Sequence, residues 1–168
     1  MRRYTIAILV RNQFGVLNRV TSMFRRRQFN IACLTVSETE TPAYSRITVL
    51  FDGDDVAKKQ LVSQLHKLPD IVSVEEFDAD EAISCELLLI KMPNDPVHRD
   101  EILDAARAFE AKIEDYTRDS IIMHLTGDSR RIDNFIDLMR DYGILEICRT
   151  GVVSLSRGGQ VMRQVTNL

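Results

Sequence analysis

The hydrophobic and polar positions of the chain fall into a repeating series of strands and helices. A nearly continuous apolar run, Ile6–Val10, indicates a first strand that is buried on both faces. From Val16 onward apolar residues recur at helical spacing, so a helix follows after a short loop. Alternating residues then predict strands over 31–38 and 44–51, and a second helix leads to a strand over 71–77. The predicted order of this half is βαββαβ.

The same order of elements appears again in the second half of the chain. An apolar strand over 85–92 precedes a helix, and two strands over 112–116 and 120–126 follow it. A further helix leads to a last strand over 144–155, interrupted at Gly151. The two halves therefore follow a common plan.

Helix boundaries are indicated by turn and capping residues. Gly53-Asp54 and Gly127-Asp128 each close a strand, and the aspartate of each pair is the expected N-cap of the next helix. At the end of the first helix, Asn30 is the expected left-handed cap or turn residue.

We therefore predict an α+β protein made of two tandem ferredoxin-like βαββαβ sandwiches, each with two helices on one face of an antiparallel sheet. The expected domains are 1–78 and 84–168, joined by a polar linker over 79–83. The tail from about Arg157 is expected to be poorly ordered.

The first strand of each half has few polar residues on either face. A sheet with helices on one side only is expected to alternate, yet Ile6–Val10 and Cys85–Ile90 are almost wholly apolar. One interpretation is that another domain, a second copy or a partner protein covers both open faces. The other is that these are ordinary core strands whose outer face tolerates apolar residues.

The segment Arg11–Leu17 is the candidate for binding. A strand passes into a helix through a loop that contains Asn12 and Gly15, which leaves backbone N–H groups unpaired at the helix start. These donors and the positive end of the helix dipole suit a small anion such as a carboxylate. We hypothesise that the loop binds the carboxylate of a small regulatory ligand; the alternative is a plain strand-to-helix turn.

Composition indicates a soluble globular protein. Of the 168 residues 45% are apolar and 28% are charged, and the net charge of −3 favours neither nucleic acid nor an anionic membrane. No apolar run approaches the roughly 20 residues of a membrane span, and no signal-peptide cleavage site follows the N-terminus. Three widely separated cysteines are typical of a reducing compartment, so we expect a cytoplasmic protein.

Catalysis has little support in the sequence. The three histidines, His66, His98 and His124, share no motif, and no signature of a nucleophile, phosphate loop or metal site is present. We expect neither a catalytic residue nor a metal site in this chain.

Two sets of residues resemble a known family. The segment Arg11–Val20 resembles the N-x-x-G-x-L-x-R-V opening of ACT domains, which are amino-acid-sensing regulatory modules. Phe29–Val36, followed by Ser45–Thr48, is similar to the pattern R-G-F/Y-N-I-x-S-L-T-V…L-S-R-M/L of acetolactate synthase small subunits. Arg149–Gly158 resembles the ending of that family, A-R-[ST]-G-[VI]-V-[GA]-L-x-R-G. The resemblance spans nearly the whole chain.

This resemblance implies a regulatory subunit in branched-chain amino acid biosynthesis, without an active site or bound cofactor of its own. Such subunits activate a catalytic subunit that uses thiamine diphosphate, Mg²⁺ and FAD, and they confer feedback inhibition, usually by valine. The family also implies a homodimer in which ACT domains pair side by side with valine at their interface. The alternative is a stand-alone amino-acid-sensing ACT regulator of another enzyme or of transcription, although no DNA-reading element is evident.

The resemblance also implies which residues hold the effector. One chain would contribute Asn12 and the backbone of Gly15, Val16 and Leu17, and the neighbouring chain would contribute Asn30 and Ile31. Gly15 lets the backbone approach a carboxylate, the amides of Val16 and Leu17 donate to it, and an asparagine oxygen accepts from the ammonium. Departures from the family pattern leave the identity of the effector open: Gln28 replaces a usual Gly, Cys33 a common Ser and Ser37 a common Ala.

Overall fold

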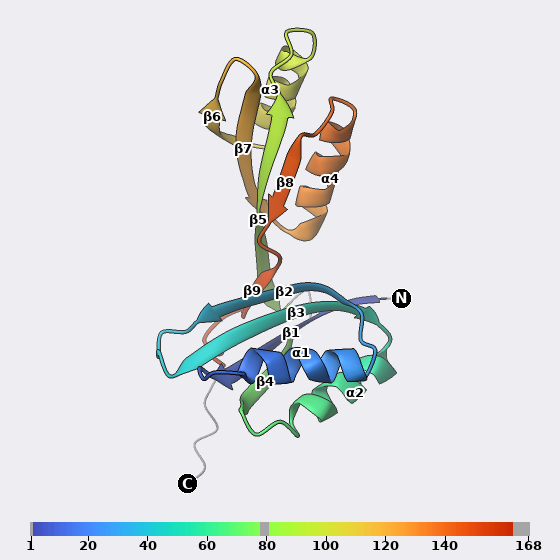
Figure 1. Cartoon of the computed structure of the whole chain (residues 1–168), viewed down its shortest axis with the longest axis vertical. Helices are drawn as coiled ribbons and strands as arrows, with labels where there is room; N and C mark the ends of the chain where they lie inside the picture. Colours follow the sequence, from blue (N-terminus) through green and yellow to red (C-terminus); the bar gives the residue numbers. More distant parts are fainter. Residues whose placement is uncertain (1, 78–80, 163–168) are drawn as a thin grey trace. The chain divides into compact units, whose positions relative to one another are not determined.

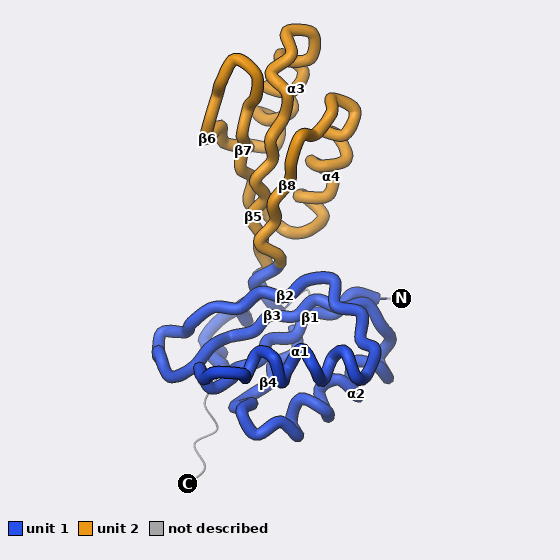
Figure 2. Tube along the Cα trace, viewed as in Figure 1, with its two compact units in different colours: residues 1–83, 152–168 blue, residues 84–151 orange. Residues whose placement is uncertain are grey.

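The computed structural model describes residues 2–77 and 81–162. Contacts divide the chain into two compact units, one formed by Met1–Ile83 with Val152–Leu168 and the other by Ser84–Gly151 (Figure 2). No helix in the described part of the chain is long and apolar enough to cross a membrane.

The first unit is a four-stranded antiparallel sheet with two helices packed on one face (Figure 1). Its strand order is β2-β3-β1-β4, so the first strand of the unit lies in the interior of the sheet. The elements are β1 Arg2–Arg11, α1 Val16–Arg26, β2 Ile31–Glu38, β3 Tyr44–Gly53, α2 Asp55–Leu65 and β4 Ile71–Phe77.

The second unit repeats this topology with its own strands. Its strand order is β6-β7-β5-β8, which places its four strands in the same sequence of positions as in the first unit, and β9 also pairs with β5. The prediction of two ferredoxin-like α+β units is confirmed. The elements are β5 Ala82–Pro93, α3 Arg99–Ala108, β6 Lys112–Tyr116, β7 Ser120–Gly127, α4 Ser129–Arg140 and β8 Glu146–Arg149. The last strand, β9 Val153–Ser156, belongs to the first unit.

Local hydrogen bonds explain where the helices begin. The carboxylate of Asp54 accepts from the amide of Ala57 at 2.7 Å, and that of Asp128 accepts from the amide of Arg131 at 2.8 Å. Both predicted N-caps are confirmed, because a side-chain oxygen satisfies an amide that has no partner within the helix.

The end of the first helix differs from the prediction. The left-handed residue is Gln28, with φ of 57°, and not Asn30. The amide of Phe29 reaches back to the carbonyl of Phe24 at 3.1 Å, the hydrogen bond that closes a helix through a left-handed residue. This geometry explains why a glycine is usual at the position of Gln28 in the family that the chain resembles.

The burial of the two central strands also differs. Ile6 to Val10 of β1 are all buried, including Ala7 and Leu9 on the face away from the helices, as the sequence indicates. In β5, by contrast, Leu89 is 38% exposed between the buried Leu88 and Ile90, so this strand alternates. Only the first of the two apolar strands is therefore covered on both faces within the described chain.

The chain's own C-terminal segment, Val153–Met162, covers β1 on the helix-free face. Arg46 of β3 donates to the carbonyl of Ser154 at 2.6 Å, and the hydroxyl of Ser156 donates to the carboxylate of Glu75. These contacts group the residues from Val152 onward with the first unit, whereas we expected 84–168 to form one domain.

The structure describes only part of the segments that we predicted as linker and tail. Of the expected linker 79–83, residues 79 and 80 lie outside the described chain, and Ala82 already begins β5. Of the expected tail, residues 163–168 lie outside the described chain as well. Arg157 itself is placed, and its amide donates to the carbonyl of Glu81 at 2.8 Å.

Candidate functional site

The loop between β1 and α1 is attached to two neighbouring segments of the first unit. The amide of Asn12 donates to the carbonyl of Ala43 at 2.8 Å, just before β3. The amide of Arg11 donates to the carbonyl of Asp70 at 3.0 Å, just before β4. Backbone hydrogen bonds to both sides therefore set the position at which the chain enters α1.

Gly15 is the N-cap residue of α1, and its conformation favours glycine. Its φ is 81°, which an L-residue with a side chain adopts only at a cost. A Cβ at this position would also lie 3.3 Å from Nη1 of Arg19, one helical turn further along. The backbone of Gly15 is thus accessible, and a guanidinium group lies beside it.

The first amides of α1 have different partners. The amide of Val16 donates to the carbonyl of Gln13 at a long 3.3 Å, and the helical ladder begins with Arg19 donating to Gly15. No described side chain caps the helix, so Leu17 and Asn18 carry the backbone donors at its start. Of the two amides that we expected to face a ligand, that of Leu17 is therefore better placed than that of Val16.

Arg19 adds positive charge to this helix start. Its Nε donates to Oδ2 of Asp70 at 2.6 Å, and Asp70 is only 8% exposed. Asp70 thus contacts two residues of this segment. Its backbone carbonyl accepts from the amide of Arg11, and its carboxylate accepts from Nε of Arg19. Sequence reasoning did not single out Arg19 as a site residue, although its place four residues after Gly15 puts it on the same helical face.

Asn12 is oriented by the turn between β2 and β3. Its Nδ2 donates to Oε1 of Glu38 at 3.2 Å and to the carbonyl of Pro42 at 3.0 Å. Because both partners are acceptors, they bind the amino group of the side-chain amide, and the oxygen points the other way. That orientation agrees with a role in accepting a hydrogen bond from a ligand ammonium.

Hydrophobic side chains flank the loop. Phe14 is fully exposed at its tip, and Leu17 is 42% exposed on α1. Val16 is buried in the core, so only its backbone is available to a ligand.

Asn30 and Ile31 follow the C-terminal end of α1, whereas Gly15 caps its N-terminal end. The helix has 11 residues, which at a rise of about 1.5 Å each separates its ends by about 16 Å. The structure therefore brings Asn12, Gly15, Val16 and Leu17 together but leaves Asn30 and Ile31 apart from them within one chain.

Other candidate chemistry is dispersed. Two histidines have single acidic neighbours: His98 lies 3.3 Å from Glu101, and His124 lies 2.5 Å from Glu114. Among residues 2–77 and 81–162, no group of three His, Cys, Asp or Glu side chains is arranged to hold a metal ion.

Family models and known proteins match almost the whole chain. A model for the AHAS small subunit-like ACT domain matches residues 6–73, and one for the small subunit of acetolactate synthase matches residues 85–158. A probable acetolactate synthase small subunit of Archaeoglobus fulgidus is 45% identical over 158 residues, which is 94% of this chain and 99% of that protein.

Two further similarities agree with this match. The acetolactate synthase small subunit of Bacillus subtilis is 41% identical over 92% of this chain and 91% of its own length. The crystal structure of the small subunit from Thermotoga maritima has a TM-score of 0.87 at 34% identity, covering 95% of this chain and all of that one. The resemblance found in the sequence is confirmed.

Proposed function

The chain belongs to the family of acetolactate synthase small subunits, and we propose that it activates a catalytic subunit and confers feedback inhibition by valine. The observation that best supports effector binding is the start of α1. Gly15 exposes its backbone there, no described side chain caps the helix, and Arg19 lies alongside. The first turn of α1 also contains no acidic residue that would repel a carboxylate.

The geometry suggests how valine would bind. Its carboxylate would accept hydrogen bonds from the amide of Leu17 and from Arg19, and its ammonium would donate to the side-chain oxygen of Asn12. Charge-assisted hydrogen bonds of this kind are the strongest available to a small zwitterion. An apolar wall would discriminate valine from isoleucine or leucine by only about 1–3 kcal/mol, so those amino acids are the necessary comparison.

The remaining part of the site would come from a second copy of the chain. Asn30 and Ile31 lie too far from Gly15 in one chain to contact the same small ligand, since α1 separates them by about 16 Å. We therefore propose a homodimer with ACT domains side by side, in which Asn30 and Ile31 of one copy complete the site of the other.

Catalysis would belong entirely to the partner. Thiamine diphosphate, Mg²⁺ and FAD are proposed to bind the catalytic subunit, and we propose a cytoplasmic location for the complex. Valine changes the partner's activity only if its affinity differs between two states of the assembly. A site shared by two chains supplies such a difference, because the ligand favours one arrangement of the domains.

Reconstitution with the catalytic subunit tests this proposal. The chain is expected to raise acetolactate formation, and titration with valine, leucine and isoleucine identifies the effector. In Gly15→Asp, the new carboxylate would lie beside Arg19 and take the place of the ligand carboxylate. Inhibition is therefore expected to disappear while activation persists.

Gly143→Asp is the matched control. Gly143 also has φ of 81°, but a Cβ there would have no neighbour within 4 Å. The two variants share the backbone strain of a side chain at positive φ, and only Gly15→Asp places charge at the proposed site. If valine inhibits the Gly15→Asp complex at the wild-type concentration, the effector does not bind at this loop.

A further inference from the structure

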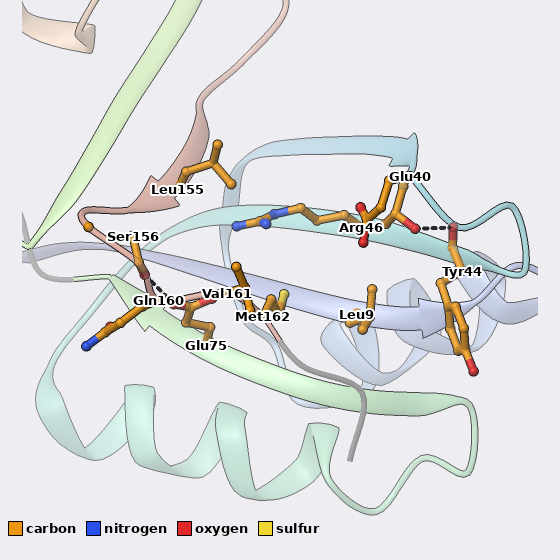
Figure 3. A pocket seen from close by; sticks show the side chains of 12 residues that line it. Leu9, Glu40, Tyr44, Arg46, Glu75, Leu155, Ser156, Gln160, Val161 and Met162 are labelled. Carbon is orange, nitrogen blue, oxygen red and sulfur yellow. Dashed lines mark hydrogen bonds between the residues drawn. The ribbon is translucent and has the colours of Figure 1, made fainter. Parts of the chain in front are cut away.

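A cavity of about 350 Å³ lies between the helix-free face of the first sheet and the C-terminal segment Val153–Met162 (Figure 3). It is formed within the first unit and does not include the loop that contains Gly15. Its volume falls within the range of small-molecule sites, which is about 300–1,000 Å³. Strands β1, β3 and β4 form its floor, and the C-terminal segment covers it.

Charges of both signs face this cavity without neutralising one another directly. Arg46 projects from β3, Glu75 projects from β4, and Glu40 follows β2. Within the described chain, Arg46 forms no ion pair with either carboxylate; it donates to the carbonyl of Ser154 at 2.6 Å and lies over the ring of Phe77 at 5.7 Å. Burial lowers the pKa of Arg46 from its usual value, and the charges of Glu75 and Glu40 oppose this effect.

The rest of the lining provides apolar surface, and a buried polar group without a partner lies nearby on the same face of the sheet. Leu9, Leu155 and Val161 lie around the charged groups. Ser73 pairs with Leu9 across the sheet and precedes Glu75 by two residues, so it shares their face. Its hydroxyl oxygen is buried and has no hydrogen-bond partner among the described residues. The face of the sheet that carries the cavity thus includes a buried hydroxyl that the described chain leaves without a partner.

We propose that this cavity is a second small-molecule site, which binds a zwitterion with a short apolar side chain, as in an apolar α-amino acid. The ligand carboxylate pairs with Arg46, its ammonium pairs with Glu75, and its side chain packs against Leu9 and Val161. Because two carboxylates and one guanidinium line the cavity, its net charge is negative, which disfavours phosphates and other anions. The ligand joins the sheet to the C-terminal segment, so bound ligand holds that segment in place.

Calorimetry on the full-length chain with L-valine and L-leucine tests the proposal. Binding is measured in the Gly15→Asp background, where the loop site is blocked and only the cavity remains. We expect one remaining site per chain. Isobutylamine and isovalerate, which each retain one of the two charges, are expected to bind at least about tenfold more weakly than valine.

Two substitutions assign that remaining site to the cavity. Glu75→Gln keeps a hydrogen-bond acceptor for Ser156 but removes the charge, and Met162→Trp fills the space; each is expected to weaken binding at least about tenfold. The matched controls are Glu76→Gln, the neighbouring carboxylate paired with Lys58, and Val97→Trp, an exposed position in the second unit. Neither control is expected to change binding.

Limited proteolysis gives an independent readout. Valine is expected to slow tryptic cleavage after Arg157 in the Gly15→Asp chain, because the ligand bridges the segment to the sheet. If the Gly15→Asp chain binds no amino acid, or if Glu75→Gln and Met162→Trp bind as before, the inference is wrong and the proposed loop site is unaffected. If the holoenzyme is insensitive to valine, the proposed function fails, but binding in the cavity is still measured separately.

Discussion

The two units share one topology, yet in the described part of the chain the start of α1 suits an anion and the equivalent start of α3 does not. Helix α1 follows a glycine and has no acidic residue in its first turn, whereas α3 follows His98 and carries Asp100 and Glu101 there. Acidic side chains at a helix N-terminus interact favourably with its positive end and repel an approaching carboxylate. Two duplicated folds can thus differ in ligand binding through a few residues at one equivalent position.

The asparagines that follow the first strand of each unit show the same contrast. Asn94 is 5% exposed; its Nδ2 donates to the carbonyl of Thr117 at 2.5 Å, and its Oδ1 accepts from Nε of Arg99 at 2.6 Å. Asn12 is exposed, and its side-chain hydrogen bonds within the described part of the chain use only Nδ2. The second unit uses its asparagine to close the loop, while the first leaves the oxygen available.

The substitution with the largest expected effect breaks a buried ion pair that is found in the second unit. In the second unit Arg149 contacts Glu86 at 2.5 Å and Asp133 at 2.7 Å, and the side chain of Glu86 is only 3% exposed. Burial alone lowers the pKa of Arg149, but its hydrogen bonds to Glu86 and Asp133 raise it above its usual value. Arg149→Met leaves a buried carboxylate unpaired and is expected to cost about 3 kcal/mol of stability.

Urea denaturation followed by circular dichroism measures this loss. Arg140→Met is the control, because Arg140 is 70% exposed and, among the described residues, pairs only with Asp137 on its own helix. Adding Glu86→Gln to Arg149→Met is expected to recover part of the stability. A loss below about 0.5 kcal/mol for Arg149→Met would mean that the pair does not hold the second unit together.

Arg19→Gln is expected to have a smaller effect. It should weaken inhibition by valine more than it weakens activation of the catalytic subunit. It removes the guanidinium beside Gly15, so the valine concentration for half-inhibition of the reconstituted enzyme should rise about tenfold or more. Arg25→Gln, at the far end of the same helix, is the control. Unchanged inhibition in Arg19→Gln would assign Arg19 a purely structural role with Asp70.

The N-cap aspartates of α2 and α4 are expected to contribute equally to the stability of the two units. Asp54→Ala and Asp128→Ala each remove one hydrogen bond to an amide in the first turn, at 2.7 and 2.8 Å. Each substitution is expected to cost about 1 kcal/mol in urea denaturation. A much larger loss for one of them would reveal a tertiary role for that aspartate beyond capping.

Several elements follow from local sequence. The bounds predicted for β2 and β4, 31–38 and 71–77, are those of the structure. Alternation and turn residues act within a few positions, so a short window of sequence contains the information. The capping aspartates are predictable for the same reason. The position of the left-handed residue after α1 was not predictable in this way. It depends on where the helix ends, and hydrophobic periodicity locates a helix end only within a residue or two.

The sequence by itself determined two βαββαβ units, their caps and a loop with accessible backbone at Gly15, since each depends on neighbouring residues. Only the tertiary structure decided that Asp70, 51 residues away, holds Arg19 beside that loop. It likewise decided that the C-terminal segment covers β1, through a hydrogen bond from Arg46 to Ser154 across 108 residues. Such contacts depend on which surfaces meet after the sheets form, and hydrophobic periodicity contains no information about that choice.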